Sequence, residues 1–299
     1  MTELRSLISR NCRLFYKDKG TFFTSLITPA ILLVLYMTFL AKVYQDTFTQ
    51  ALTGMVSADD PIIKSLVNAS LFSSLLAVSS VTVAFCSNMI MVQDKASGVI
   101  NDLRITPVKR SVLSLGYYVS TTVSTLTICL ITGIIYCIYM AISGWYLTAG
   151  ELLLILLDIF LLVMMGTALS SIINVFISTQ GQMSAVGTIV SSGYGFICGA
   201  YMPLSQFGAG LRTVLSFLPG TYGTAILKNL SFAGIFRELS NKGVPNEAID
   251  ELKGAFDCVV SFFDTTVELG AMFAVLSVAV VVLVLVYVCL NAKMNKAKR

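Results

Sequence analysis

The sequence predicts an all-α membrane protein with six transmembrane helices, and two observations carry this prediction. Apolar residues make up 56% of the 299 residues and charged residues only 12%, which lies outside the balance of soluble domains. Apolar runs of about twenty residues, long enough to cross a bilayer as a helix, recur along the chain. The whole chain, 1–299, is therefore predicted to be a single transmembrane domain. The predicted spans are 21–43, 66–92, 112–142, 151–177, 183–203 and 267–290.

Residues 1–20 precede the first span and are predicted to form an amphipathic interfacial helix. Leu4, Leu7, Ile8, Cys12 and Phe15 fall on one helical face, and basic side chains fall on the other. A helix of this kind lies in the plane of the lipid headgroups. The alternative is a plain basic flank that serves only to orient the first span.

Lys and Arg residues are distributed unequally between the connecting segments. They gather in the N-terminal segment, in the connection between the second and third spans, and in the C-terminal tail. Because cytoplasmic segments are enriched in basic residues, we expect both termini and segment 93–111 to be cytoplasmic. Segment 204–266 is then extracellular, and we expect a multi-pass protein of the cell (plasma or inner) membrane.

Segment 93–111, "QDKASGVINDLRITPVKRS", is a charged island between two apolar spans. Ser97 can cap a short helix in which Val99, Ile100 and Leu103 share one face, and the Thr-Pro step at 106–107 ends that helix. The apolar face has no evident partner in its own chain. We therefore expect a cytoplasmic helix whose apolar face docks on another protein.

The fifth predicted span carries small residues every four positions. Gly187, Ser191, Gly195 and Gly199 form a stripe that lets another helix, from this chain or a second copy, approach closely. The alternative is the general glycine enrichment of membrane helices. In the first span, Pro29 is expected to kink the helix or to mark its wide cytoplasmic end.

Asp158 lies deep within the fourth predicted span. An ionised carboxylate at the bilayer centre costs at least about 2.5 kcal/mol on insertion scales, so Asp158 should face a cavity, another helix or a polar partner. A functional role is the default interpretation. The alternative is a protonated or hydrogen-bonded carboxyl group kept for packing alone.

Segment 204–266 begins apolar and then becomes polar. The Pro-Gly step at 219–220 divides "FLPGTYGTAILKNL" and indicates a short helix pair that dips toward the membrane. After Pro245, residues Ile249, Leu252 and Phe256 recur at helical spacing and predict an amphipathic helix. We therefore expect short extracellular helices between the fifth and sixth spans.

Several kinds of chemistry are not expected of this chain. It contains no histidine, and its seven cysteines show neither metal-ligand nor disulfide spacing. It also lacks the phosphate-binding loop G-x-x-x-x-G-K-[ST]. We expect no catalytic residue, no metal site, no cofactor bound by this chain and no nucleic-acid partner.

The order of these elements and two motifs resemble the membrane subunit of ABC-2-type exporters. The motifs are "SGVINDLRITPVKR" in segment 93–111 and "FLPGTY" at 217–222. The resemblance covers the whole chain. The chain departs from the family pattern at Gln93-Asp94-Lys95, where a Glu-Arg-rich start is common, and in an outer segment, 232–266, that is longer than in minimal members.

The resemblance implies a permease, not an enzyme: two such subunits form the path, and separate ATP-binding cassette subunits bind ATP and Mg. It implies ATP-driven export of an amphiphilic compound, such as a drug, an antibiotic, an antimicrobial peptide or a lipid-linked molecule, and a bacterial source is expected. The first and fifth spans would line the dimer interface and the path. The residues implied for the path or interface are Gly187, Ser191, Gly195, Gly199, Pro29 and Asp158. Those implied for coupling to the ATPase are Gly98, Val99, Ile100, Leu103, Arg104, Thr106 and Pro107.

Two other classes of protein remain open on the sequence. An ion-coupled secondary transporter or a channel would use Asp158 as a proton or cation site. A non-transporting immunity or sensor protein could keep the same fold. Copurification with an ATPase subunit separates the exporter from both, and ATP-dependent transport separates it from the last.

Overall fold

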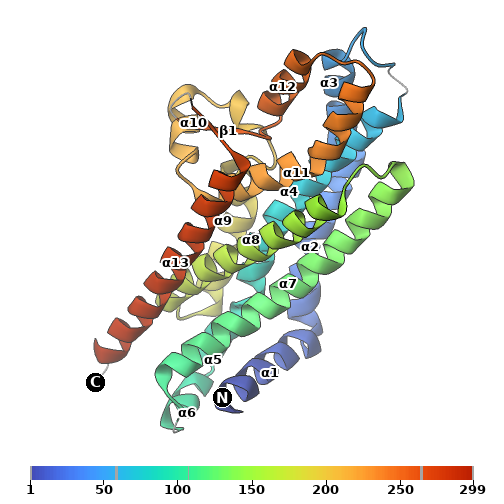
Figure 1. Ribbon diagram of the computed structural model, residues 1–299. Coiled ribbons are helices and arrows are strands. Elements are labelled where there is room, and N and C mark those ends of the chain that lie inside the picture. The colour runs from blue at the N-terminus through green and yellow to red at the C-terminus, as the bar shows by residue number, and fades with distance from the viewer. Residues whose placement is uncertain (1, 58–59, 107, 263–264, 298–299) are drawn as a thin grey trace.

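The computed structural model describes residues 2–57, 60–106, 108–262 and 265–297, and these residues are almost entirely helical (Figure 1). The all-α membrane fold predicted from composition is confirmed. The first half contains α1 (Thr2–Lys17), α2 (Lys19–Leu35), a π-helical turn (Tyr36–Leu40), α3 (Ala41–Ala51), α4 (Pro61–Ser87), α5 (Met89–Ala96), α6 (Val99–Ile105) and α7 (Arg110–Ser143).

The second half begins with α8 (Ala149–Phe176) and α9 (Gln180–Ile197). A 3-10 turn and the short helix α10 then lead into α11, which is followed by α12, a two-stranded antiparallel hairpin and the last helix. These elements are Leu204–Gln206, α10 (Ala209–Leu215), α11 (Pro219–Asn241), α12 (Asn246–Ala255), β1 (Val260–Phe262), β2 (Thr265–Val267) and α13 (Leu269–Ala297).

Five helical segments among the described residues are long and apolar enough to cross a membrane. The predicted fifth span, 183–203, is not one of them, because more than half of the residues of α9 are Gln, Gly, Ser or Thr and the helix ends at Ile197. Six spans therefore remain a prediction. The five segments are Lys19–Ala51, Pro61–Ala96, Arg110–Ala141, Ala149–Phe176 and Leu269–Asn291.

Local sequence signals explain where several of these helices begin. Asp60 caps α4 by accepting a hydrogen bond from the backbone N–H of Ile62 at 3.0 Å, and Pro61 occupies the first helical position. Thr148 and Glu151 form a reciprocal capping box at the start of α8. Thr179 and Gln182 do the same for α9.

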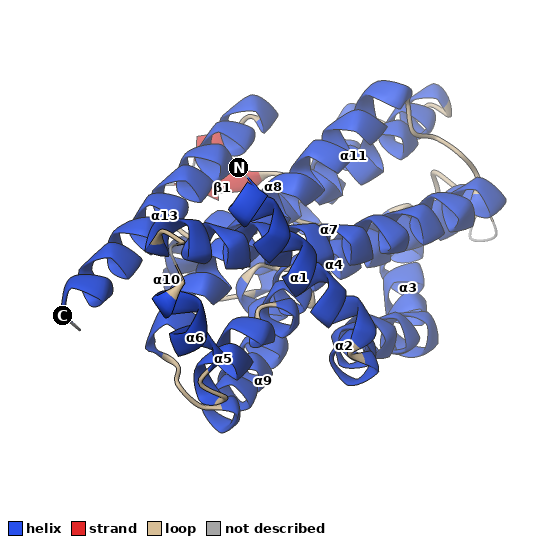
Figure 2. Cartoon of the chain, turned by 90° about the horizontal axis from the view of Figure 1, so that it is seen from below, coloured by secondary structure: helices blue, strands red, loops and turns tan. Residues whose placement is uncertain are grey.

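Helix α4 forms the centre of the molecule. Viewed from below, it lies between α13 on one side and α2 with α3 on the other (Figure 2). It packs on α2, α7, α8, α9 and α11, and nearly all of its side chains are buried. Both chain ends lie at the end of the molecule that carries α1, α5 and α6, here called the basic end, and the hairpin, α3, α10 and α12 lie at the opposite end (Figure 1).

Candidate functional site

Helix α6 projects from the basic end on a tight turn. Ser97 closes α5: its hydroxyl donates to the carbonyl of Gln93 at 2.8 Å and does not cap α6. The turn is made by Gly98, which has a left-handed φ of +83° that other residues rarely adopt. The predicted Ser97 cap is therefore wrong, because the sharp turn at Gly98 leaves Ser97 within the last turn of α5.

The apolar face of α6 packs largely on its own chain, which corrects the expectation that it has no partner there. Ile100 is only 7% exposed and belongs to a cluster with Leu7 of α1 and Leu113 of α7. Leu103 packs against the same cluster, and Val99 is half-buried. Periodicity within one helix could not reveal this contact, because the cluster is formed by α1, α5 and α7 when they fold together.

Ile105, at the end of α6, is the apolar side chain of this helix that stays in the open. It is 86% exposed. Thr106 follows it and is also exposed, and its hydroxyl donates to the carbonyl of Leu103 at 2.6 Å. Pro107 and the side chain of Arg104, both implied for coupling, lie outside the described residues.

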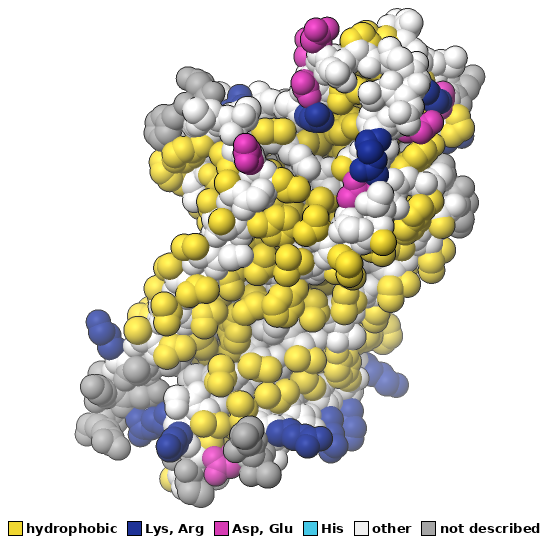
Figure 3. Space-filling view, in the orientation of Figure 1, with side chains coloured by type: hydrophobic (Ala, Val, Ile, Leu, Met, Phe, Trp, Pro, Cys, Tyr) yellow, Lys and Arg dark blue, Asp and Glu magenta, His cyan; other side chains and the backbone are white. Residues whose placement is uncertain are grey.

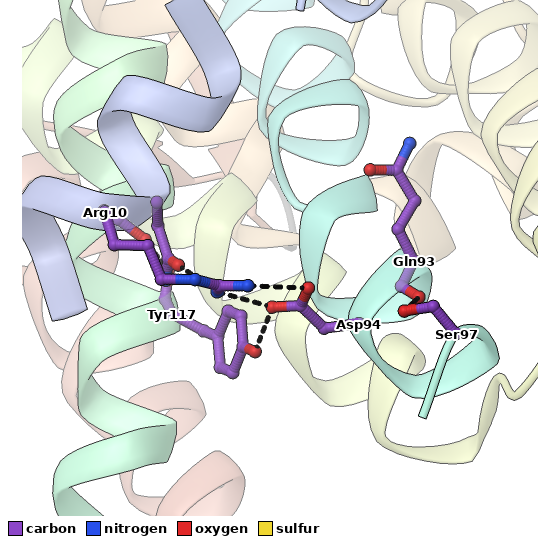
Figure 4. A network of polar contacts seen from close by, with 7 residues as sticks. Arg10, Gln93, Asp94, Ser97 and Tyr117 are labelled. Carbon is purple, nitrogen blue, oxygen red and sulfur yellow. Dashed lines mark hydrogen bonds and ion pairs between the residues drawn. The ribbon is translucent and has the colours of Figure 1, made fainter. Parts of the chain in front are cut away.

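A charged network holds α5 against α1 and α7 (Figure 4). The Arg10 guanidinium donates to both carboxylate oxygens of Asp94, at 2.7 and 3.0 Å, and the Tyr117 hydroxyl donates to Asp94 at 2.5 Å. Asp94 is only 6% exposed, so a paired cation is needed to offset its desolvation. The hydrogen bond to Asp94 raises the pKa of Arg10. The sequence flagged Asp94 only as a departure from the family pattern.

Lys95, the next residue, ties α5 to the end of α8. Its ammonium group donates to the backbone carbonyls of Asn174, Val175 and Ile177, the last two at 3.2 Å. These carbonyls have no partner within the helix, and the C-terminus of a helix favours a positive charge. The short α5 is thus fixed to α1, α7 and α8 by two successive residues.

A groove with a volume of about 750 Å³ runs between α2 and α9. Thr24, Ile27 and Ile31 of α2 line one side of it. Gly187, Ser191 and Ser192 of α9 line the other, and no atom lies within 4 Å of the position that a Cβ of Gly187 would occupy. The helix α2 continues through Pro29, which is buried. The first and fifth predicted spans therefore line opposite sides of an open, partly polar groove.

The predicted small-residue stripe is only partly a helix surface. Gly195 is covered by the ring of Tyr201 from its own chain, and a Cβ at Gly195 would lie 2.3 Å from that ring. Gly199 lies beyond the end of α9 with a left-handed φ of +74°. The expectation of four residues on one packing face is wrong for these two, because the chain turns back at Ile197 and covers the end of the stripe.

Asp158 lies in α8 and is fully buried. Neither of its carboxylate oxygens has a hydrogen-bond partner among the described residues. Two residues lower on α8 do have partners: Asn88, between α4 and α5, donates to the hydroxyls of Ser170 and Ser171, both at 3.0 Å. Asp158 does not line the groove between α2 and α9.

The described residues contain no group of three or more His, Cys, Asp or Glu side chains that could hold a metal ion. Their long apolar helices define a multi-pass membrane protein. Residues 2–232, more than three quarters of the chain, match the family model described as ABC-2 type transporter, so the chain belongs to this family and is an ABC transporter permease. No relative was found among curated proteins. The segment after residue 232, which includes α12 and the hairpin, lies beyond the match.

Proposed function

We propose that this chain is the permease subunit of an ATP-driven exporter. It pairs with a second permease, identical or paralogous, and with separate ATP-binding subunits that supply ATP and Mg. The exported compound is amphiphilic. Support comes from the family match, from the exposed end of α6, and from the open groove between the first and fifth predicted spans.

The proposed orientation places the basic end in the cytoplasm of a cell, here a bacterial one. Lys and Arg side chains gather at this end, while the middle of the molecule is largely hydrophobic (Figure 3). Single cysteines at Ser97 and Asn241, in a variant lacking the native cysteines, test the orientation. Only the second should react with an impermeant thiol reagent on whole cells, and equal labelling would contradict the orientation.

The observation that carries the proposal is the exposed Ile105 on α6, which directly follows the anchored helix α5. A large apolar side chain that is exposed at the end of a helix next to an anchored one can insert into a cleft of a partner. Burying such a side chain fully is worth about 1.5–3 kcal/mol. Loss of that contact would weaken binding of the ATPase subunit about tenfold or more.

The substitution Ile105→Asp tests this contact. It should leave the permease folded, because Ile105 touches little of its own chain, and should reduce copurified ATPase subunit and substrate-stimulated ATP hydrolysis. Asn101→Asp is the matched control, since it adds the same charge to α6 at an exposed position without removing an apolar side chain. If Ile105→Asp behaves like wild type in both assays, α6 does not couple to an ATPase, and a channel, an ion-coupled transporter or a non-transporting protein becomes the better interpretation.

The groove is the proposed path or dimer surface. Gly187→Leu places a branched side chain in its open part, where a Cβ meets no other atom within 4 Å. We expect a folded permease with impaired dimerisation or substrate-stimulated hydrolysis. Normal behaviour in both would show that the groove serves neither purpose.

A further inference from the structure

Asp158 is the one carboxyl group among several buried polar side chains of the described residues that have no hydrogen-bond partner. The Asp158 side chain is fully buried, and neither carboxylate oxygen accepts or donates a hydrogen bond within the described residues. Burying a carboxyl group is costly in either protonation state unless it is hydrogen-bonded. A partner that is not part of this chain is therefore expected at Asp158.

Tyr194 of α9 supplies the second such group. Its hydroxyl is buried and also has no hydrogen-bond partner, and it interacts electrostatically with the Asp158 carboxyl. A Cβ at Gly220, in the first turn of α11, would lie 2.5 Å from this hydroxyl. The phenol thus reaches α11.

The register of α4 and α8 locates the third group. Asn88 bonds to Ser170 and Ser171, an offset of 82 to 83 residues, and a Cβ at Gly166 would lie 2.9 Å from the carbonyl of Ser80, an offset of 86. Subtracting these offsets places Asp158 at the level of residues 72–76 of α4. The hydroxyl of Ser74, in that stretch, is buried and without a partner.

We propose that Asp158 is a proton-binding site that exchanges its proton, during the transport cycle, with water held between Asp158, Tyr194 and Ser74. The site needs polar partners and water supplies them, since one molecule makes about three hydrogen bonds in such places. On release, the carboxyl O–H bond breaks, the proton passes to a water molecule as hydronium, and the electron pair remains on the carboxylate. Tyr194 can then donate to the water that faces that carboxylate.

The surrounding side chains favour a proton as the cation that neutralises the Asp158 carboxylate. Helices α4, α7 and α13 all pack on α8. No Asp, Glu, Lys or Arg occurs in the stretches of the chain that hold their membrane-spanning parts, 65–93, 111–143 and 269–292. On α11, Lys228 donates to the carbonyl of Gly199 at 2.8 Å and lies 3.7 Å from Asp257. Glu151 is paired with Arg237 two turns away along α8. Both cations of α11, Lys228 and Arg237, are thus paired with other carboxylates among the described residues.

The two helices that meet at the site are held differently, which gives the exchange a mechanical cause. Helix α8 packs on α4, α7, α11 and α13. Helix α9 buries only Met183 and Gly195 fully, and its other face lines the groove. Under the proposed exporter function, on which this inference rests, movement of α9 would shift Tyr194 relative to a fixed Asp158 and open or close the water to exchange.

Infrared spectroscopy of the purified full chain in lipid nanodiscs tests the site without any ATPase subunit. We expect a carbonyl-stretch band of a protonated carboxyl that is lost in Asp158→Asn, shifts in D2O and bleaches as the pH is raised. Tyr194→Phe should shift the band, because it removes the neighbouring donor. Tyr287→Phe is the control, since Tyr287 is also a buried tyrosine but its hydroxyl donates to the carbonyl of Ser114 near the start of α7, and it should leave the band unchanged.

Three results would overturn the inference. A band that does not shift in D2O would mean a sealed carboxyl kept for packing, and a band that persists at every pH would mean one that never releases its proton. Absence of the band in wild type would mean an ionised carboxylate with a cation other than a proton. Asp158→Asn is nearly isosteric, and unchanged circular dichroism and elution volume would show that it folds. These outcomes do not depend on Ile105, so they separate this inference from the proposed function.

Discussion

Helices α4 and α2 are both apolar enough to cross a membrane, but they occupy opposite environments. In the most apolar stretch of each segment, 89% of the residues are buried around α4 and only 19% around α2. The difference lies in side-chain size: α4 carries Ser, Thr and Ala at many positions, whereas α2 presents Phe23, Ile27, Ile31 and Val34 to the outside. Hydropathy therefore marks a membrane helix, while small residues mark the one that other helices surround.

The largest expected effect comes from Gly166→Leu on the face of α8 that meets α4. A Cβ there would lie 2.9 Å from the carbonyl oxygen of Ser80 and 3.0 Å from the Cα of Val81, both backbone atoms that cannot move aside. Overpacking of this kind costs about 1–3 kcal/mol and occasionally more. We expect a lower thermal transition in detergent and a lower yield of folded protein.

Gly187→Leu is the matched change at the rim of the molecule, where α9 lines the groove. Because no atom lies within 4 Å of its Cβ position, its free energy of unfolding should stay within about 0.5 kcal/mol of the wild-type value. Its thermal transition should therefore stay near that of wild type. Equal destabilisation by the two substitutions would break the distinction between a crowded centre and an open rim.

Gly195→Leu should have an intermediate effect, and it tests where the open part of α9 ends. Since the Tyr201 ring occupies the space of the missing side chain, the variant should lose stability through this contact and not through a second helix. Adding Tyr201→Ala should restore part of the lost thermal stability. If the double variant is no more stable than Gly195→Leu, Tyr201 is not what limits this position.

The smallest effect concerns Asp60, where α4 meets the end of α11. The hydrogen bond from Lys242 lowers the pKa of Asp60, so the ionised form is favoured in the folded state. This contribution is present above the unfolded pKa of about 3.9 and is lost as the pH falls through the lowered folded value.

Asp60→Asn isolates this charge, because Asn caps a helix about as well as Asp. We expect a loss of about 1 kcal/mol or less near pH 7, since Lys242 is partly exposed and screened by water. Thermal melts below about pH 4 should show a shallower pH dependence for the variant than for wild type. A large loss at pH 7 would mean that charge, and not packing, holds the outer end of α4.

Local signals in the sequence located the helices, because hydropathy and capping residues act over a few positions. The predicted stretches 66–92, 112–142 and 151–177 lie close to α4 with α5, α7 and α8. The helix predicted after Pro245 forms but ends at Ala255, where Asp257 adopts a left-handed φ of 55° and accepts a hydrogen bond from the N–H of Leu204. That contact is tertiary, so helical spacing could not reveal the hairpin that follows.

The candidate site was harder to predict, because its contacts join distant segments. Arg10 and Asp94 are 84 residues apart, and no periodic pattern pairs them. Ile100 looked available to a partner because periodicity within α6 could not show that it joins a cluster with α1, α5 and α7. Gly195 and Gly199 had the spacing of a helix face, but spacing could not show that the chain reverses at Ile197.

Lys95 links α5 rigidly to the junction between α8 and α9. Its ammonium group donates to three carbonyls at the junction of α8 and α9, and the adjacent Asp94 binds α1 through Arg10. Under the proposed function, a movement of α6 caused by a bound ATPase subunit would pass through α5 to this junction. Helix α8 packs on α4, α7, α11 and α13, whereas α9 packs on α4 and α5 and lines the groove, so α9 would move more and change the width of the groove.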